Sequence, residues 1–208
     1  MRRHRQSDAD LNRHGSDSDA DLLVICDGSC PLERHGDIGF SSQVYSPTDT
    51  HTVLRSPARC TTDLAACTPA MAELVGVILS LEALEQHLIA IGWNQPVKAH
   101  LFLDSQTAVE EVVDFSPQRL ASRGMSHLVG LCRLAHRRVL AHTRQGNTIL
   151  IRRPPRSRYS RLIRRADREA KEARRNGAPT PEQEVVDAVR SGEANLVAAG
   201  MPGWRLEF

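Results

Sequence analysis

The chain has 208 residues, of which 40% are hydrophobic and 25% are charged, and its formal net charge is +2. This length and composition predict one globular domain with a core and additional tails. No apolar run approaches the ~18 residues that a membrane span requires. The basic N-terminal stretch is followed by no apolar segment, so neither a membrane protein nor a signal peptide is expected.

The five cysteines are odd in number and include no Cys-x-x-Cys pair. The sequence therefore offers neither the ligand spacing of a zinc site nor a disulfide framework. Reduced and mostly buried thiols are the expectation, and they indicate an intracellular protein, in the cytoplasm or the nucleus.

The first quarter of the chain predicts a polar arm and three strands. Residues 1–19 are rich in Asp, Ser, Arg and His without periodic apolar positions, which predicts a disordered arm. The unbroken apolar run Leu22–Cys26 predicts a central strand that is buried on both faces. Residues 36–45 and 51–55, separated by a Ser-Pro-Thr-Asp turn, predict two strands that continue the sheet as a meander.

A long helix is predicted next. Thr68 suits its N-cap, a proline follows at the first helical position, and Gly92 is a suitable end. Between them, apolar residues recur at helical spacing. The run Val97–Leu103 then predicts a strand, and residues 106–115 predict a helix that is closed by a proline.

The rest of the chain predicts further helices and one strand. A helix is expected over about residues 126–144, a short apolar strand over 148–151, and a basic helix over about 160–175. Residues 182–190 predict one more short helix.

The predicted order is three strands, a helix, a strand, two helices, a strand and a helix. It indicates an α/β fold whose mixed five-stranded sheet begins as a three-strand meander, continues through helical crossovers and is flanked by helices. The domain is expected to cover residues 20–177, with residues 178–208 as a C-terminal extension.

Two predicted strands are each followed directly by an aspartate, Asp27 and Asp104. If these strands are parallel neighbours, both carboxylates lie at the same edge of the sheet, where α/β proteins place their sites. Adjacent carboxylates repel one another, and a divalent cation removes that conflict. Each residue also has a structural alternative: Asp27 with Gly28 makes a turn, and Asp104 or Ser105 caps the following helix.

Two further acidic residues lie on predicted helices. Glu73 is in the first turns of the long helix, where the helix dipole alone would favour it. Asp167 is in the basic helix, where it could form an ion pair with Arg164 or Lys171. Spacing alone does not bring either residue to Asp27.

Positive charge is concentrated near the end of the predicted domain. Residues 152–175 hold eleven Arg or Lys against three Asp or Glu, a local charge of +8 in a chain whose total is +2. Such a block indicates an anionic partner, and its alternative is a solvated helix face.

Four motifs resemble those of the type I ribonuclease H family, in the family's order. Asp27 lies in Cys-Asp-Gly-Ser, and Glu73 lies in Thr-Pro-Ala-Met-Ala-Glu-Leu, which is similar to the family's T-x-x-x-A-E-L. Asp104 lies in Leu-Asp-Ser-Gln, and Asp167 lies in Arg-Ala-Asp-Arg-Glu-Ala-Lys-Glu-Ala. The resemblance covers roughly residues 20–177 and implies a ribonuclease H-like fold. The spacing of the last elements resembles the reverse-transcriptase members of retroelements, which lack a separate basic helical handle.

The resemblance implies a metal-dependent endonuclease that hydrolyses the RNA strand of RNA–DNA hybrids. Its four carboxylates would hold two Mg²⁺ ions, with Mn²⁺ as a substitute, and such ions stabilise the attacking and leaving oxygens. Asp27 would bridge the two ions, Glu73 and Asp104 would hold one of them, and Asp167 would complete the other. The hybrid would be recognised through phosphates and 2′-hydroxyls in its wide minor groove.

The sequence also departs from the family's pattern. The loop before the last helix usually carries a histidine that aids product release, but residues 152–159 contain none. Ile163, Pro69 and Ala70 replace asparagines of the family. The expected nucleic-acid contacts form one set: Ser29, Ser105, Arg153, Arg156 and Arg158.

Three functions remain open at this stage. The complete set of four carboxylates favours an active hybrid ribonuclease. The histidine-free loop favours a catalytically weak or inactive module that binds nucleic acid or accompanies a reverse transcriptase. A related exonuclease of the same fold is the third alternative, which the Asp-Gly-Ser and Ala-Glu-Leu motifs disfavour.

Overall fold

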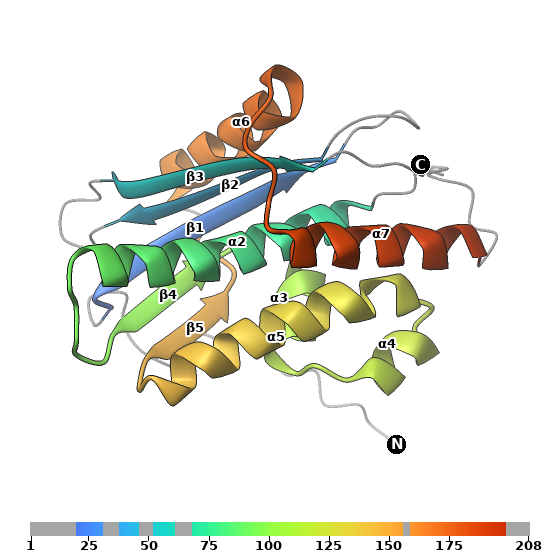
Figure 1. The fold of residues 1–208 in the computed structure, drawn as a ribbon, viewed down its shortest axis with the longest axis horizontal. Coiled ribbons are helices and arrows are strands. Elements are labelled where there is room, and N and C mark those ends of the chain that lie inside the picture. The colour runs from blue at the N-terminus through green and yellow to red at the C-terminus, as the bar shows by residue number, and fades with distance from the viewer. Residues whose placement is uncertain (1–19, 31–37, 46–51, 61–67, 156–158, 199–208) are drawn as a thin grey trace.

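The computed structural model describes residues 20–30, 38–45, 52–60, 68–155 and 159–198. The predicted polar arm of residues 1–19 lies outside this part of the chain. The described strands form one five-stranded sheet in the order β3-β2-β1-β4-β5 (Figure 1). Their bounds are Leu22–Ser29 for β1, Ile38–Tyr45 for β2, Thr52–Cys60 for β3, Lys98–Phe102 for β4 and Thr148–Arg152 for β5.

The sheet is mixed, as the sequence predicted. Strands β1, β2 and β3 pair antiparallel as a meander, whereas β4 is parallel to β1 and β5 is parallel to β4. Strand β1 is longer than predicted, because its pairing with β2 continues through Asp27, which lies opposite Ser41, to Ser29, which lies opposite Gly39. Asp27 is therefore a strand residue and not part of a turn.

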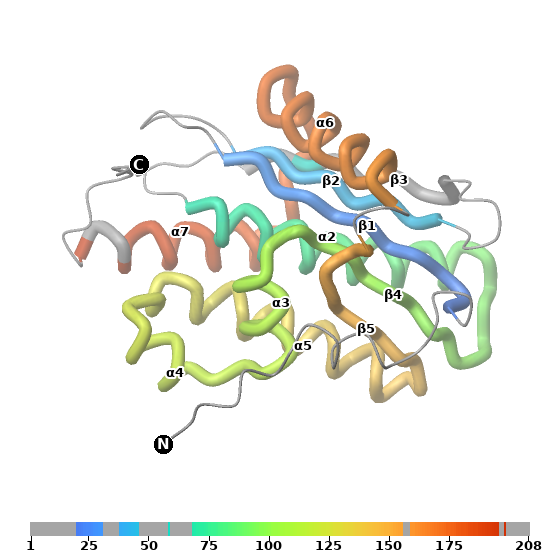
Figure 2. Tube along the Cα trace, turned by 180° about the vertical axis from the view of Figure 1, so that it is seen from behind, coloured from blue at the N-terminus to red at the C-terminus, as the bar shows by residue number. Residues whose placement is uncertain are grey.

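The helices lie on both faces of this sheet. Helices α2, α5 and α7 cover one face, and α6 lies alone on the other (Figures 1 and 2). Their bounds are Pro69–Ala90 for α2, Gln106–Val113 for α3, Pro117–Ser122 for α4, Val129–Arg144 for α5, Ser160–Asn176 for α6 and Gln183–Ala198 for α7, with a 3₁₀ turn at Ser126–Leu128 before α5. Among the described helices, none combines the length and apolar character that a bilayer crossing needs.

Two cores result from the alternation of side chains along the sheet. In β1, Val24 and Cys26 enter the larger core beneath α2, whereas Leu23 and Ile25 enter a smaller core beneath α6. The larger core also takes in the valines of α7, so the packed unit extends past residue 177, where the domain was expected to end.

Helix α2 forms where the sequence predicted it. The Thr68 hydroxyl accepts a hydrogen bond of 3.2 Å from the Met71 backbone N–H, which caps the first turn, and Pro69 needs no such partner. The helix ends at Ala90, and Gly92 follows with a φ of +63°, a value that favours glycine.

The segment between β4 and α5 differs from the prediction. The helix that begins at Gln106 ends at Val113, and a separate short helix, α4, begins at Pro117. The Ser116 hydroxyl accepts from the Arg119 N–H at 3.3 Å, so Ser-Pro starts this helix as well as closing the previous one. Helix α7 also extends to Ala198, beyond the predicted end at residue 190, and in this added part Gly192 lies close to the His127 carbonyl oxygen.

Glycines bring the two helical layers unusually close to the strands. A methyl group at Gly28 would lie 2.4 Å from the Ala72 carbonyl oxygen of α2. A methyl group at Gly39 would lie 2.1 Å from the Ala170 carbonyl oxygen of α6. Both neighbours are backbone atoms that cannot rotate away, so each glycine fixes the distance between a helix and the sheet.

Replacing Gly39 by alanine should destabilise the fold by about 1–3 kcal/mol, because α6 must move away from β2. The measurement is chemical unfolding followed by circular dichroism. Gly130→Ala is the matched control, since a methyl group there meets no atom nearer than 3.8 Å. The control should leave stability unchanged or raise it by up to about 1 kcal/mol. Equal stabilities of the two variants would contradict the tight contact at Gly39.

Candidate functional site

Asp27 and Asp104 lie at the same edge of the sheet, as predicted. Their strands are parallel neighbours, and the last pair in register is Ile25 with Phe102. Each aspartate lies two residues beyond that pair along its own chain. The Ser105 hydroxyl accepts a 3.2 Å hydrogen bond from the Ala108 N–H and thus caps α3. Ser105, and not Asp104, is the cap, which leaves the Asp104 carboxylate available.

Glu73 reaches the site because the start of α2 lies directly on β1. The position that a side chain of Gly28 would occupy is 2.7 Å from the Glu73 backbone nitrogen. One turn further along the helix, the corresponding position at Gly76 is 3.4 Å from the Asp27 carbonyl oxygen. The contact of helix and strand therefore places Glu73 beside Asp27.

The charges of the other predicted carboxyl groups act on the pKa values of Glu73 and Asp27. Burial is the main reason that the pKa of Glu73 rises to about 9, and the charges of Asp27, Asp104 and Asp167 raise it further. Burial also raises the pKa of Asp27 to about 6, with a contribution from Asp167. A hydrogen bond with Glu73, the Gly28 N–H at 3.0 Å and the charge of Lys171 oppose this increase.

Asp167 belongs both to this group and to an ion pair on its own helix. The Lys171 ammonium lies 2.7 Å from an oxygen of its carboxylate, at the i,i+4 spacing that the sequence offered as an alternative. The Asp167 side chain is 44% exposed, so this ion pair adds little stability. The pair leaves Asp167 near enough to raise the pKa values of Asp27 and Glu73.

The residues that were predicted to contact nucleic acid differ in their position and exposure. Arg153 lies 3.4 Å from Asp104, whose side chain is 71% exposed, so this arginine is at the site. Ser29 is 7% exposed and offers little of its hydroxyl to a ligand. Arg156 and Arg158 lie outside the described residues.

No three His, Cys, Asp or Glu side chains within the described ranges stand together as a ready metal cluster. Asp104 and Asp167 instead point to cationic partners, Arg153 and Lys171. The donor chemistry nevertheless suits Mg²⁺, since every group is a carboxylate. The buried Oε2 of Glu73 has no hydrogen-bond partner in the described structure, and a cation would satisfy it. The residues therefore fit a metal ion, provided that Asp104 releases Arg153 and Asp167 releases Lys171 when the ion binds.

A polar network in the middle of the sheet was not expected from the sequence. The Tyr45 hydroxyl donates to Gln43, whose amide donates to Glu169 of α6 at 2.5 Å, and the Ser41 hydroxyl donates to the same carboxylate at 3.3 Å. Ser41 lies opposite Asp27, so the network fixes α6 next to the site. The run Ser-Ser-Gln inside a predicted strand was the available signal.

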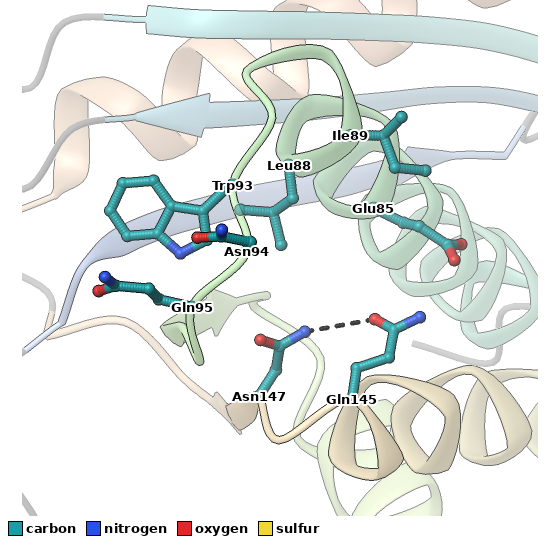
Figure 3. A pocket seen from close by; sticks show the side chains of 8 residues that line it. All are labelled: Glu85, Leu88, Ile89, Trp93, Asn94, Gln95, Gln145 and Asn147. Atoms are coloured by element: carbon teal, nitrogen blue, oxygen red, sulfur yellow. Dashed lines mark hydrogen bonds between the residues drawn. The ribbon is translucent and has the colours of Figure 1, made fainter.

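A pocket of about 290 Å³ lies elsewhere, between the end of α2, the following loop and the end of α5 (Figure 3). Leu88 and Trp93 line it, and a hydrogen bond of 3.4 Å joins Asn147 to Gln145 across one side. Leu88 is fifteen residues along α2 from Glu73, about 22 Å at 1.5 Å per residue. This pocket is therefore not part of the carboxylate site.

Comparison with known proteins matched no family model and no curated protein sequence. Solved structures do match. The ribonuclease H1 of the halophilic archaeon Halobacterium salinarum NRC-1 is 19% identical with a TM-score of 0.50, and the match covers 73% of this chain and 96% of that one. The LC11 ribonuclease H1 isolated from compost is 17% identical with a TM-score of 0.54, covering 76% and 97%.

A third match is the foamy viral protease-reverse transcriptase, solved in complex with an RNA/DNA hybrid. It is 13% identical with a TM-score of 0.55, and the match covers 83% of this chain but 22% of the viral one. Identities this low establish the fold and leave the activity to be argued from the site. The mixed sheet, its helical layers and these likenesses together show that the chain has a ribonuclease H-like fold.

Proposed function

We propose that the protein is a metal-dependent endonuclease that hydrolyses the RNA strand of RNA–DNA hybrids. The observation that carries this proposal is the electrostatic environment of Glu73, where burial and three other carboxylates raise the pKa to about 9. Buried carboxyl groups that repel one another destabilise a fold, and perturbed pKa values of this kind are typical of functional sites.

The four carboxylates would hold two Mg²⁺ ions, for which Mn²⁺ would substitute. Asp27 would be shared by the two ions, Glu73 and Asp104 would hold one, and Asp167 would complete the other. Bound there, the ions supply charge stabilisation for the attacking water and the leaving oxygen, so that the products carry a 5′-phosphate and a 3′-hydroxyl.

The chain's own groups prepare this site. Asp27 and Glu73 must release their protons before they bind a cation, and the Gly28 N–H and the Lys171 charge already favour the ionised form of Asp27. Arg153 is placed to move from Asp104 to a phosphate of the substrate, because both side chains are exposed. Neither Arg153 nor Lys171 acts as a base in this arrangement.

The hybrid substrate is inferred from the structural likenesses together with the charge of the chain. Two of the similar structures are named ribonuclease H1, and a third is a viral enzyme in complex with an RNA/DNA hybrid. The basic block of residues 152–175 suits a polyanion. Recognition through phosphates and 2′-hydroxyls would select the hybrid without reading its sequence.

The second candidate function is a nucleic-acid-binding module with weak or no hydrolysis. The observation that favours it is the absence of histidine from residues 152–159. Without a proton carrier in that loop, product release is the step expected to slow. This candidate keeps the fold and the basic surface, and differs from the first in turnover alone.

Asp104→Asn should reduce cleavage of a labelled RNA–DNA hybrid by at least about 100-fold, because the variant loses one charged ligand of the site. The wild-type chain should cut only the RNA strand, with Mg²⁺ or Mn²⁺, and chelation by EDTA should abolish cutting. Duplex DNA, duplex RNA and single strands are measured in parallel.

Asp187→Asn is the matched control, since this exposed aspartate lies on α7, across the sheet from α6. It should cleave as the wild type does. A folded wild-type chain that binds the hybrid but cuts it with neither metal would favour the binding module. Equal activity of the Asp104 and Asp187 variants would remove Asp104 from the site.

Without divalent cations, the melting temperature should fall as the pH rises from about 4 to about 9. The pKa values of Asp27 and Glu73 are raised from 3.8 and 4.5 to about 6 and about 9, so the folded chain binds more protons than the unfolded chain. These two groups stabilise the folded state fully when the pH is below their pKa values in the unfolded chain. This stabilisation is lost as the pH rises through their pKa values in the folded chain.

Glu73→Gln removes the larger of these two effects. At pH 8 in EDTA, the variant should melt at least about 3 °C above the wild type, and Mg²⁺ should stabilise the wild type more than the variant. The control is Glu110→Gln, at an exposed position on α3. Identical pH profiles for the wild type and the Glu73 variant would contradict the buried position of this carboxyl group.

A further inference from the structure

We propose that the outward side of α6 is a binding surface for the phosphate backbone of a nucleic-acid duplex, beyond the catalytic carboxylates. This surface, here termed the arginine face, consists of Arg161, Arg164, Arg168 and Arg175, all of them exposed. The inference deepens the proposed function and rests on it, since the duplex would be the same hybrid that reaches the carboxylates.

The four arginines share one side of the helix. Their positions, i, i+3, i+7 and i+14, fall within an arc of about 60° at 3.6 residues per turn. The opposite side carries Ala166, Ala170 and Ala173, which are buried against the sheet. The arginine face therefore points away from the sheet, on the side where no other helix of the described residues lies next to α6 (Figure 2).

The charges of this face are not neutralised by the described chain. No ion pair in the described structure involves any of the four arginines. By contrast, Arg119 of α4 and Arg123, which follows that helix, both pair with the buried Glu111, at 3.0 and 2.5 Å. Arg138 of α5 pairs with Glu182 at 2.8 Å. These three arginines across the sheet are thus paired with carboxylates, whereas all four arginines of the arginine face are presented to solvent.

The face is continuous with the carboxylate site. Asp167 lies on the flank of α6 next to Arg164 and Arg168, three residues after the first and one before the second. From Arg161 to Arg175 the helix extends about 21 Å, which is the length of about six base pairs at 3.4 Å each. A duplex engaged at the carboxylates could therefore continue along the helix.

Several features favour a duplex over a lipid surface. A membrane-binding helix inserts large apolar side chains between its basic residues. On α6 the large apolar side chains, Leu162 and Ile163, pack instead into the smaller core. Glu172, at i+11 from Arg161, lies about 20° outside the arc, so the face remains strongly positive. A row of guanidinium groups with no apolar anchor suits phosphates.

The test compares two double variants with the same change in charge. Arg164→Gln/Arg168→Gln alters the arginine face, and Arg133→Gln/Arg144→Gln alters two exposed arginines of α5, across the sheet. Binding of a labelled 18-base-pair hybrid is measured by fluorescence anisotropy in EDTA, which prevents cleavage, over a series of salt concentrations. Circular dichroism checks that both variants fold.

The α6 variant should bind the hybrid more weakly and flatten the plot of log affinity against log salt by about 1.8, as expected for two lost phosphate contacts. The α5 variant should change the slope by much less. Equal effects of the two variants, or a wild-type slope in the α6 variant, would overturn the proposal. So would α6-dependent binding to phosphatidylserine vesicles without binding to the hybrid.

Cleavage by the same variants separates this proposal from the proposed function. If the wild type cuts the hybrid and the α6 variant binds it with a wild-type slope, the proposed binding role of the arginine face is wrong, whereas the proposed nuclease function is supported. If the wild type binds the hybrid through α6 but cuts nothing under any metal condition, the proposed nuclease function is wrong, whereas the proposed binding role of the arginine face is supported.

Discussion

The candidate site depends on the burial of two carboxyl groups, Asp27 and Glu73, against each other. In water each would ionise near pH 4, but here their pKa values rise to about 6 and about 9. Gly28 lets α2 lie directly on β1, which buries the pair, and the Gly28 N–H and the nearby positive charge of Lys171 partly offset the cost for Asp27. The buried carboxyl groups thus lower the stability of the folded chain at one edge of the sheet, as is typical of functional sites.

Most of the fold could be predicted from the sequence, since its strongest signals are local. The apolar run of β1 and the Thr68 cap of α2 both led to the correct elements. The order of elements was sufficient for the mixed sheet. The prediction failed where tertiary contacts decide the bounds of an element. Pairing with β2 extends β1 to Ser29, and α7 continues to Ala198 past Gly192, which lies close to the His127 backbone.

The site could be predicted in part. The sequence placed Asp27 near Asp104 on the condition that their strands are parallel neighbours, and the pairing of β1 with β4 meets that condition. Glu73 and Asp167 required the family resemblance, because no rule of spacing relates a helix to a distant strand. The contact of Arg153 with Asp104 and the link from Gln43 to Glu169 depend on side-chain geometry across the sheet, which a linear sequence does not encode visibly. Both surround the carboxylates and shape their environment.

The connectivity of the sheet has a consequence for the order in which the candidate site assembles. Strand β1 pairs with β4, in which Leu101 lies opposite Val24, and the fourth carboxylate arrives only with α6, some 140 residues after the first. Contacts between such distant segments form slowly, because the intervening chain loses much of its freedom before they are made. The carboxylates should therefore come together late in folding, so that an incomplete chain emerging from the ribosome would have strands and a first helix but no assembled carboxylate site.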